Sequence, residues 1–330
     1  MTLLSVKNLR VNLRTDAGRL RAVRGVDISV ERGQTLCLVG ESGCGKSMAA
    51  LAMLGLLPPS AEWSADEMKL DGVSLLNAGQ STLSNIRGNR VSMIFQEPMT
   101  ALNPTFTIRD QLCGVYRRHK GGNRAQARER AIYLLERVGI SNARNRLDQY
   151  PHELSGGLRQ RVLIAMALMC EPELIICDEP TTALDVTTQA QILVLLAELR
   201  EELGMGMIFI THDLGVVSRI GDHINVMYAG RVVESGTRDA VLGCASHPYT
   251  QGLLRSVPRP GVNGLQSRLG TIPGTVPSFY QADPLCPFRG RCERKLPICA
   301  SQAPPVRSGA GHHSALCHNT EISSIAGNSA

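Results

Sequence analysis

The residues best suited to chemistry form a glycine-rich run near the N-terminus, Gly40-Glu41-Ser42-Gly43-Cys44-Gly45-Lys46-Ser47, with the spacing G-x-x-x-x-G-K-[ST]. Glycines in this pattern let consecutive backbone N–H groups converge on phosphate oxygens, and the lysine reaches the outer phosphates of a nucleotide. The hydroxyl of Ser47 is placed to bind Mg²⁺, and the N-terminus of the following helix adds its dipole. Residues 40–47, called the P-loop below, therefore predict a site for a nucleoside triphosphate and Mg²⁺.

A pair of carboxylates, Asp178 and Glu179, follows the apolar segment LIIC at residues 174–177. At the end of a buried strand, Asp178 would face a metal ion, and Glu179 is placed to polarise an attacking water. Such a pair by itself is also typical of a solvated turn. Because it follows a P-loop in the same chain, it indicates hydrolysis of the nucleotide.

Three further segments carry polar groups at the ends of predicted elements. Ser155-Gly156-Gly157 opens a helical run, an arrangement that can bind an anion or simply cap the helix. Gln96 follows the apolar segment VSMIF, and His212 lies directly after the segment MIFIT. A single histidine is more often structural than catalytic, so its position at the end of a strand makes His212 a candidate.

These side chains need strands that end at one edge of a sheet. Strands are predicted at four apolar runs, residues 35–40, 91–95, 174–177 and 207–210. The continuous apolar runs 174–177 and 207–210 are typical of strands buried on both faces of a parallel sheet. The P-loop is followed by a helical pattern, which opens a βαβ unit. Helical periodicity covers residues 124–138 and 158–170, whereas the first 35 residues alternate as in an antiparallel sheet.

The segment LSGG-x-RQR at residues 154–161, between the P-loop and the acidic strand, resembles the signature of ATP-binding cassette (ABC) ATPases. The resemblance implies an α/β fold, a P-loop NTPase cassette with a RecA-like parallel sheet core, an antiparallel β subdomain and a helical signature subdomain at about residues 97–160. It also implies ATP hydrolysis at a site shared by two subunits. Ser155, Gly156 and Gly157 of one subunit would close over the γ-phosphate held by the P-loop of the other.

The same resemblance gives roles to single residues. Gln96 matches the Q-loop glutamine, which with Ser47 and Asp178 would hold Mg²⁺ and sense the γ-phosphate. Ala183-Leu184-Asp185 matches the D-loop, with Asp185 at the dimer interface. His212 in the segment ITHD matches the switch histidine, which would hydrogen-bond the γ-phosphate and act beside the catalytic Glu179.

The adenine contact departs from the family pattern. Leu13 stands where many members have a Tyr or Phe that stacks on adenine. An aliphatic side chain can pack on the ring with less π overlap. Either Leu13 or Val23 would therefore contact the base.

A narrower resemblance covers nearly the whole chain. Three segments, QEPMTALNP at residues 96–104, HPYT at 247–250 with Leu253-Leu254, and IPGTVP at 272–277, resemble the ATPase of oligopeptide and dipeptide permeases among ABC importers. The resemblance implies an ATP-hydrolysing subunit that powers uptake of di- or oligopeptides from the cytoplasmic face of the membrane. Nickel, sugars and opines are other cargoes of this subfamily, so peptide is only the commonest choice.

This subfamily also implies partners. They are a second ABC ATPase, favoured as a paralogue, two transmembrane permease subunits and an extracytoplasmic substrate-binding protein. Residues 97–104 would lie against the permease subunits, and Pro98 and Pro104 predict an extended loop there rather than a helix.

A second hypothesis is a soluble ABC ATPase of DNA repair or chromosome maintenance. Those proteins insert a coiled coil or zinc modules between the P-loop and the signature. Only 107 residues lie between Ser47 and Ser155, and they contain no heptad array. The importer is therefore favoured, and no nucleic acid is expected as a partner.

Four of the ten cysteines, Cys286, Cys292, Cys299 and Cys317, lie in a tail rich in Pro and Gly. Their spacing lacks the C-x-x-C pairs of a zinc ribbon, whereas four thiolates around one centre suit an iron-sulfur cluster. The spacing alone is equally compatible with reduced cysteines in a flexible tail. The run CPFRGRC at residues 286–292 resembles the C-terminal element of the dipeptide-permease ATPase, which implies a 4Fe-4S cluster. Zinc is the alternative, because His312, His313 and His318 lie near Cys317.

Length and composition set the remaining limits. A chain of 330 residues with 43% hydrophobic and 19% charged residues can build a large core, which excludes disordered and fibrous classes. A change to Pro, Gly and Ser near Pro258 predicts two parts, a nucleotide-binding domain at residues 1–257 and the four-cysteine C-terminal element at 258–330. Most of the net charge of +6 lies in this second part, which has few aromatic residues and is predicted as a solvated surface.

Membrane insertion and secretion are not expected of this chain. Its longest strongly apolar run, residues 162–170, is about half of the ~20 residues that a spanning helix needs. Lys7, Arg10 and Arg14 interrupt the apolar residues at the N-terminus, so no signal peptide is predicted. The N-terminus is instead predicted as a first β-strand of a cytoplasmic protein.

Overall fold

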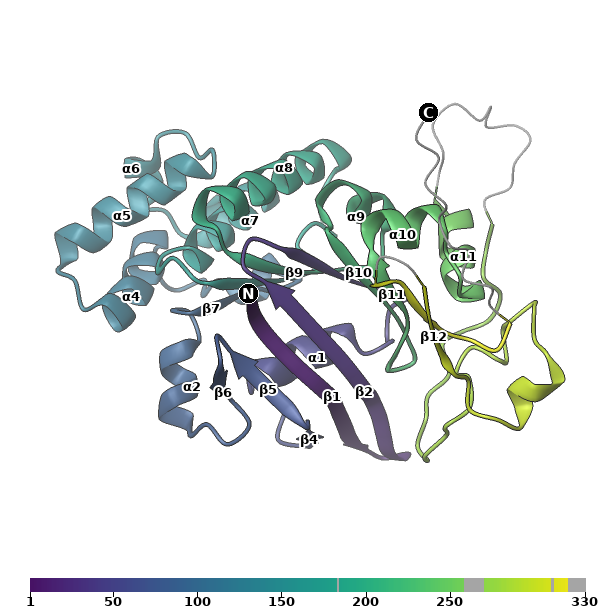
Figure 1. Ribbon diagram of the computed structural model, residues 1–330. Helices are drawn as coiled ribbons and strands as arrows, with labels where there is room; N and C mark the ends of the chain where they lie inside the picture. The colour runs from purple at the N-terminus through teal and green to yellow at the C-terminus, as the bar shows by residue number, and fades with distance from the viewer. Residues whose placement is uncertain (183, 258–269, 310–311, 320–330) are drawn as a thin grey trace, which may run out of the picture. The chain divides into compact units, whose positions relative to one another are not determined.

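The chain divides into two compact units in the computed structural model, which describes residues 1–182, 184–257, 270–309 and 312–319 (Figure 1). Unit 1 comprises Met1–Leu3, Val30–Gln34 and Leu70–Phe209. Unit 2 comprises Leu4–Ser29, Thr35–Lys69 and Ile210–Ala330. An element that crosses a boundary is named with the unit that holds most of it.

Unit 1 is mainly helical. In chain order its elements are β6 (Val73–Ser74), α2 (Gln80–Ile86), β7 (Val91–Ile94), α3 (Pro98–Ala101), α4 (Ile108–Lys120), α5 (Arg124–Arg137), α6 (Ala143–Arg146), the 3-10 helix η1 (Pro151–Glu153), α7 (Gly156–Ala167), β8 (Leu174–Asp178), α8 (Val186–Leu203) and β9 (Gly206–Thr211). Helices α4 and α5 pack against each other, and both pack against α7.

Polar side chains mark where four of these helices begin. Thr107, Asn123, Ser155 and Asp185 each accept a backbone N–H from the first turn of α4, α5, α7 and α8, respectively. Asn123 forms a full capping box with Gln126. Such caps satisfy N–H groups that have no partner inside the helix, so the helix starts are fixed by local sequence.

Two parallel strands of unit 1 carry the predicted acidic site. Strand β7 pairs with β8 over Val91↔Leu174 to Ile94↔Cys177. Every residue of β8 is buried, as is every residue of β9, which agrees with the predicted strands of a sheet covered on both faces. Because β7 and β8 run in the same direction, the residues that follow them lie at the same edge.

Unit 2 combines sheets with short helices. In chain order its elements are β1 (Thr2–Thr15), β2 (Gly18–Glu31), β3 (Thr35–Val39), α1 (Lys46–Met53), β4 (Ala61–Ser64), β5 (Glu67–Leu70), α9 (Leu214–Ile220), β10 (His223–Tyr228), β11 (Arg231–Thr237), α10 (Arg238–Gly243), α11 (Pro248–Arg255), the 3-10 helix η2 (Pro297–Ala300), β12 (Val306–Ser308) and β13 (Ser314–Leu316).

Strand pairing in unit 2 places the P-loop strand beside β10. Strand β3 is parallel to β10, which is antiparallel to β11. The order then continues through β13 to β12, both antiparallel to their neighbours. Strand β1 lies beside β2 in a second sheet and pairs with β4 in antiparallel register.

Part of the C-terminal region pairs with this sheet. Strand β13 pairs with β11 at Glu234↔Ala315 and Ser235↔Ser314. We define the C-terminal element as residues 258–330, described over 270–309 and 312–319. The predicted boundary at Pro258 lies outside the described residues.

The segment after Gln96 differs from its prediction. Instead of an extended loop, residues Pro98–Ala101 form the short helix α3, with Pro98 in its first turn. Proline is accepted there because the N–H it lacks would have no partner in the helix. The prediction considered only the residue before each proline and was wrong for this turn.

Across the part of the chain that the structure describes, no helix combines the length and the apolar character needed to span a membrane.

Candidate nucleotide site

The P-loop connects β3 to α1, as the sequence predicted. Gly45 has φ of 104°, and a Cβ atom at this position would overlap the carbonyl oxygen of Ala22. Only glycine therefore fits there. Because Gly45 is also the N-cap of α1 and no side chain caps this helix, its N-terminus fits an anion such as a phosphate.

Lys46 lies inside the P-loop with only 4% of its surface exposed. Its Nζ atom donates to the carbonyl oxygens of Gly40 at 2.7 Å and Glu41 at 3.1 Å. The loop thus holds a positive charge next to the helix N-terminus. Both features favour phosphate groups, so the residues present fit a nucleotide.

Glu41 of the P-loop is held by two residues that are distant in sequence. Its backbone N–H donates to the hydroxyl of Tyr249 at 2.9 Å, and its carboxylate accepts from Nη1 of Arg291 at 3.1 and 3.0 Å. Sequence reasoning assigned Glu41 to the cofactor site but missed Tyr249 and Arg291. A carboxylate in a loop that binds phosphates indicates that a positively charged side chain should neutralise it. The sequence does not indicate which residue of the chain provides that side chain.

His212 lies between β9 and α9 and is exposed. The next residue, Asp213, caps α9 by accepting from the backbone N–H of Gly215 at 2.7 Å. The backbone N–H of Asp213 donates to the hydroxyl of Thr211 at 3.0 Å. These bonds fix the turn that carries His212 at the carboxyl end of β9, where the sequence predicted it.

In unit 1 the structure brings Gln96 and Glu179 together. Nε2 of Gln96 donates to Oε2 of Glu179 at 3.4 Å, and the hydroxyl of Thr182 donates to the same oxygen at 2.9 Å. Asp178, the last residue of β8, is 6% exposed. The carboxyl ends of β7 and β8 therefore bring the amide of Gln96 to the carboxylate of Glu179, the residue that follows Asp178. Amide and carboxylate oxygens are ligands that suit a hydrated divalent cation.

Glu179 has an unusual backbone. Its φ is 45°, in the left-handed region that residues other than glycine rarely adopt. Such conformations cost of order 1–3 kcal/mol and are concentrated at functional sites. The strain is consistent with the predicted role of Glu179 beside an attacking water.

The predicted signature and D-loop lie at the starts of two neighbouring helices of unit 1. Ser155 caps α7, and Asp185 caps α8 by accepting from the N–H and the hydroxyl of Thr188 at 2.9 and 2.7 Å. The N–H of Thr188 is the largest cause that lowers the pKa of Asp185. A Cβ atom at Gly157 would lie 3.1 Å from Cγ2 of Thr188, so the two caps are close. Ala183, the first residue of the D-loop match, lies outside the described residues.

Leu13 and Val23 differ in their surroundings. Leu13 is half-buried in β1, opposite Ala61 of β4. Val23 is 1% exposed, and its Cγ2 would lie 3.6 Å from a Cβ atom at Gly45. Val23 therefore packs beside the P-loop.

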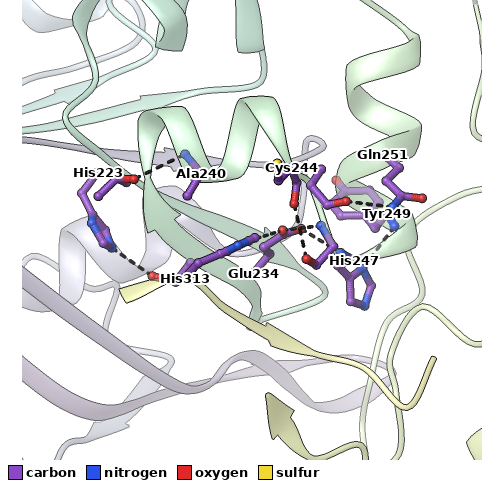
Figure 2. Close-up of polar contacts among 12 residues, drawn as sticks. His223, Glu234, Ala240, Cys244, His247, Tyr249, Gln251 and His313 are labelled. Carbon is purple, nitrogen blue, oxygen red and sulfur yellow. Dashed lines mark hydrogen bonds and ion pairs between the residues drawn. The ribbon is translucent and has the colours of Figure 1, made fainter. Parts of the chain in front are cut away.

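A buried polar cluster, drawn in Figure 2, joins three parts of unit 2. Glu234 of β11 accepts from the backbone N–H groups of Ser246 and His247 at 2.6 and 2.9 Å. Its carboxylate also bonds Nε2 of His313 at 2.7 Å. Glu234, His247 and His313 are at most 3% exposed, so the carboxylate is a fixed anchor for the start of α11 and for the C-terminal element.

The predicted iron-sulfur cluster is wrong. Among residues 1–182, 184–257, 270–309 and 312–319, no group of three or more His, Cys, Asp or Glu side chains could hold a metal ion. Burial is the main cause that raises the pKa of Cys286 to about 11, with Cys317, Cys292 and Cys299 adding to it. All four cysteines are free, and burial also raises the pKa of Cys292. Cys286 and Cys292 therefore resist the thiolate state that a cluster requires.

The zinc alternative has no support either. His313 bonds Glu234, and Nε2 of His318 lies 3.2 Å from the carbonyl oxygen of Gln302. These contacts occupy Nε2 of both histidines. The prediction rested on spacing and resemblance, which do not reveal where a side chain points.

Two family descriptions match the chain. Residues 23–182 match the description "ABC transporter", and residues 233–299 match "Oligopeptide/dipeptide transporter, C-terminal region". The first match includes the P-loop, the signature and Glu179. The second includes part of the C-terminal element, and neither match supports the alternative of a DNA-repair ATPase.

Whole proteins and solved structures agree with these matches. The chain is 49% identical to a putative peptide import ATP-binding protein of Brucella melitensis biotype 1, over 96% of both chains. It is 46% identical to the dipeptide transport ATP-binding protein DppD of Bacillus subtilis (strain 168), over 95% of this chain and 93% of that one. With the corresponding DppD of Escherichia coli (strain K12) the identity is 43%, over 96% and 97%.

Among solved structures, the dimeric ATP-binding cassette MJ0796 bound to ADP and Pi has a TM-score of 0.64 at 27% identity, over 71% of this chain and 98% of that one. For cbiO1 from Clostridium perfringens the TM-score is 0.61 at 29% identity, over 73% and 91%. These likenesses confirm the ABC ATPase cassette fold. The chain belongs to the ABC transporter family, as an ATP-hydrolysing subunit with the C-terminal region of oligopeptide and dipeptide transporters.

Proposed function

We propose that this subunit powers the import of di- or oligopeptides across the cytoplasmic membrane. The observation that carries the proposal is the similarity to peptide import and dipeptide transport proteins along nearly the whole chain, including the C-terminal region. The ATPase cassette alone would indicate ATP hydrolysis but would not identify the transported substrate. The C-terminal region of the peptide-transporter type favours peptides as that substrate.

Within the site, the P-loop would bind the phosphates of ATP through the N-terminus of α1 and the ammonium of Lys46. Ser47, Gln96 and Asp178 would hold Mg²⁺, which neutralises phosphate charge when bound. Glu179 would accept a proton from the attacking water, and the hydrogen bonds from Gln96 and Thr182 fix its carboxylate for this role. His212 would donate a hydrogen bond to the γ-phosphate.

The remaining predicted residues would act in a pair of ATPase subunits. We propose that Ser155, Gly156 and Gly157 close over the nucleotide of the partner subunit and that Asp185 lies at this interface. The exposure of Ser155, Gly156 and Asp185 supports the proposal, as does the dimeric state of the MJ0796 cassette. The partner ATPase would be a paralogue of this chain.

The complete importer would contain two transmembrane permease subunits and an extracytoplasmic substrate-binding protein, with this chain on the cytoplasmic face. Residues 97–104, which include α3, would contact the permeases. In this arrangement residues 1–257 form the nucleotide-binding domain, and residues 258–330 form an appended element held by the β11–β13 pairing. In this proposal the cysteines of the appended element are free thiols and hold no metal.

Uptake measurements test the proposal. A strain that lacks this chain should fail to take up a labelled dipeptide, and the wild-type chain should restore uptake. Lys46→Ala should not restore it, whereas Lys69→Ala should, because Lys69 is an exposed lysine that pairs with Glu67 away from the P-loop. Normal dipeptide uptake without the chain, together with lost uptake of nickel, would refute the peptide cargo but retain the ATPase role.

A further inference from the structure

Three residues hold Glu41 within the P-loop from different directions. Tyr249 accepts its backbone N–H at 2.9 Å, Lys46 donates to its carbonyl oxygen at 3.1 Å, and Arg291 donates to both oxygens of its carboxylate. Lys46 belongs to the P-loop itself, whereas Tyr249 and Arg291 are more than 200 residues away in sequence. The shape of the P-loop therefore depends on distant parts of unit 2.

Arg291 is itself held firmly by the C-terminal element. Its side chain is 8% exposed. Nε donates to the carbonyl oxygen of Pro273 at 2.8 Å and Nη2 to that of Ile272 at 3.0 Å. Nη1, which binds Glu41, also donates to the hydroxyl of Tyr228 at 3.2 Å. A planar guanidinium with donors in fixed directions is thus aimed at the P-loop carboxylate.

Tyr249 provides a second link between the same two regions. It lies in α11, whose first residues are anchored by Glu234, and Glu234 also binds His313 of the C-terminal element (Figure 2). Nδ1 of His247 accepts the backbone N–H of Tyr249 at 3.1 Å, which fixes the start of the helix. Burial raises the pKa of Tyr249, so its hydroxyl stays neutral and can accept from Glu41.

A carboxylate in this loop poses an electrostatic problem. Glu41 carries a negative charge where the loop would bind the negative phosphates of ATP, and like charges disfavour binding. The ion pair with Arg291 neutralises the carboxylate and holds it in one direction. Without this arginine, the carboxylate would be free to turn toward the phosphates.

We propose that Arg291 is a positioning residue for the nucleotide site: it holds the carboxylate of Glu41 away from bound phosphates and thereby makes nucleotide affinity depend on the C-terminal element. The inference rests on the proposed binding of ATP by the P-loop. It gives the C-terminal element a role in the ATPase cycle that does not require a metal centre.

Calorimetric titration of the full-length chain with Mg-ADP and with the slowly hydrolysed analogue Mg-AMP-PNP tests the proposal. Arg291→Met should weaken binding of both probes roughly five- to tenfold. Arg289→Met is the matched control, because Arg289 lies in the same segment but its ion pair, with Asp283 at 2.7 Å, stays within the C-terminal element. This control should bind both probes with wild-type affinity.

The double variant Arg291→Met with Glu41→Gln separates charge from structure. If the unpaired carboxylate is the cause of the weaker binding, removing its charge should restore most of the affinity. Glu41→Gln alone gives a measurement that does not depend on methionine being tolerated at position 291, and it should bind both probes at least as tightly as the wild type.

The outcomes separate the inference from the proposed function. Wild-type affinity in Arg291→Met, or a double variant that binds no better than this single variant, would overturn the inference while nucleotide binding by the P-loop stands. A wild-type chain that binds neither probe would instead refute the proposed function, and the inference with it.

Discussion

His247 should make the chain less stable as the pH falls below the ordinary histidine pKa. Burial is the main cause that lowers the pKa of His247 from 6.5 to about 4, and the nearby carboxylate of Glu234 opposes this shift. His247 is 1% exposed, and its Nδ1 accepts from Tyr249, which requires the neutral ring (Figure 2). Between pH 6.5 and about pH 4 the unfolded chain therefore binds a proton that the folded chain excludes.

The sign and size of the effect follow from this difference. Stability is fully present above pH 6.5, the unfolded value, and is lost progressively as the pH falls toward the folded pKa of about 4. Each pH unit within this window costs at most about 1.4 kcal/mol. From pH 7 to pH 5 the loss is about 2 kcal/mol. With an unfolding entropy of about 2.1 cal/mol/K per residue, this lowers the melting temperature of a 330-residue chain by roughly 3 °C.

The matched variant is His247→Asn, because asparagine also accepts a backbone N–H at the start of a helix but does not titrate. Thermal unfolding of both chains from pH 7 to pH 5 should show that the variant loses less stability than the wild type. Burial also lowers the pKa of His223, but His223 is present in both chains, so its effect cancels in the comparison. Two parallel curves of melting temperature against pH would refute the reasoning.

Other perturbations act on the same anchor and on the site. Glu234→Gln leaves a buried N–H among Ser246, His247 and His313 without an acceptor, so the free energy of unfolding should fall by about 2–3 kcal/mol in urea titrations; an unchanged urea midpoint would contradict this. Gly45→Ala places a Cβ atom against the carbonyl of Ala22 and should abolish Mg-AMP-PNP binding in calorimetry, so retained affinity would argue against the P-loop geometry. Glu179→Gln should keep nucleotide binding and slow phosphate release about 10²–10⁴-fold, whereas full turnover would remove its role as general base.

The elements that position the site could be predicted because their signals are local. Continuous apolar runs predicted β3, β7 and β8, and all residues of β3 and β8 are buried. The helical periodicity at 124–138 corresponds to α5, with a capping box at Asn123 that fixes its start. Strand direction then explains why Gln96 and Glu179, which are far apart in sequence, come within hydrogen-bonding distance.

The errors arose where distant residues decide the structure. The cysteine spacing in the tail suggested a metal site, but spacing does not reveal that His313 bonds Glu234 of β11. The strands β12 and β13 have three residues each, too few for a periodic signal. Strand β13 pairs with β11, which is distant in sequence. The segment that forms the single turn of α3, with proline in its first turn, was predicted to be an extended loop.

Glu41 shows why a local motif leaves part of a site unexplained. The P-loop pattern fixes its glycines, lysine and serine and leaves position 41 open, so the sequence does not explain a carboxylate beside the phosphate site. The structure offers a reason, since Arg291, buried and bonded to two carbonyl groups of its own segment, supplies the opposite charge. Breaking such a pair leaves an uncompensated charge, which costs far more than the pair contributes. The Glu41–Arg291 bond therefore ties the P-loop to a C-terminal element that has little core of its own, and each side constrains the other.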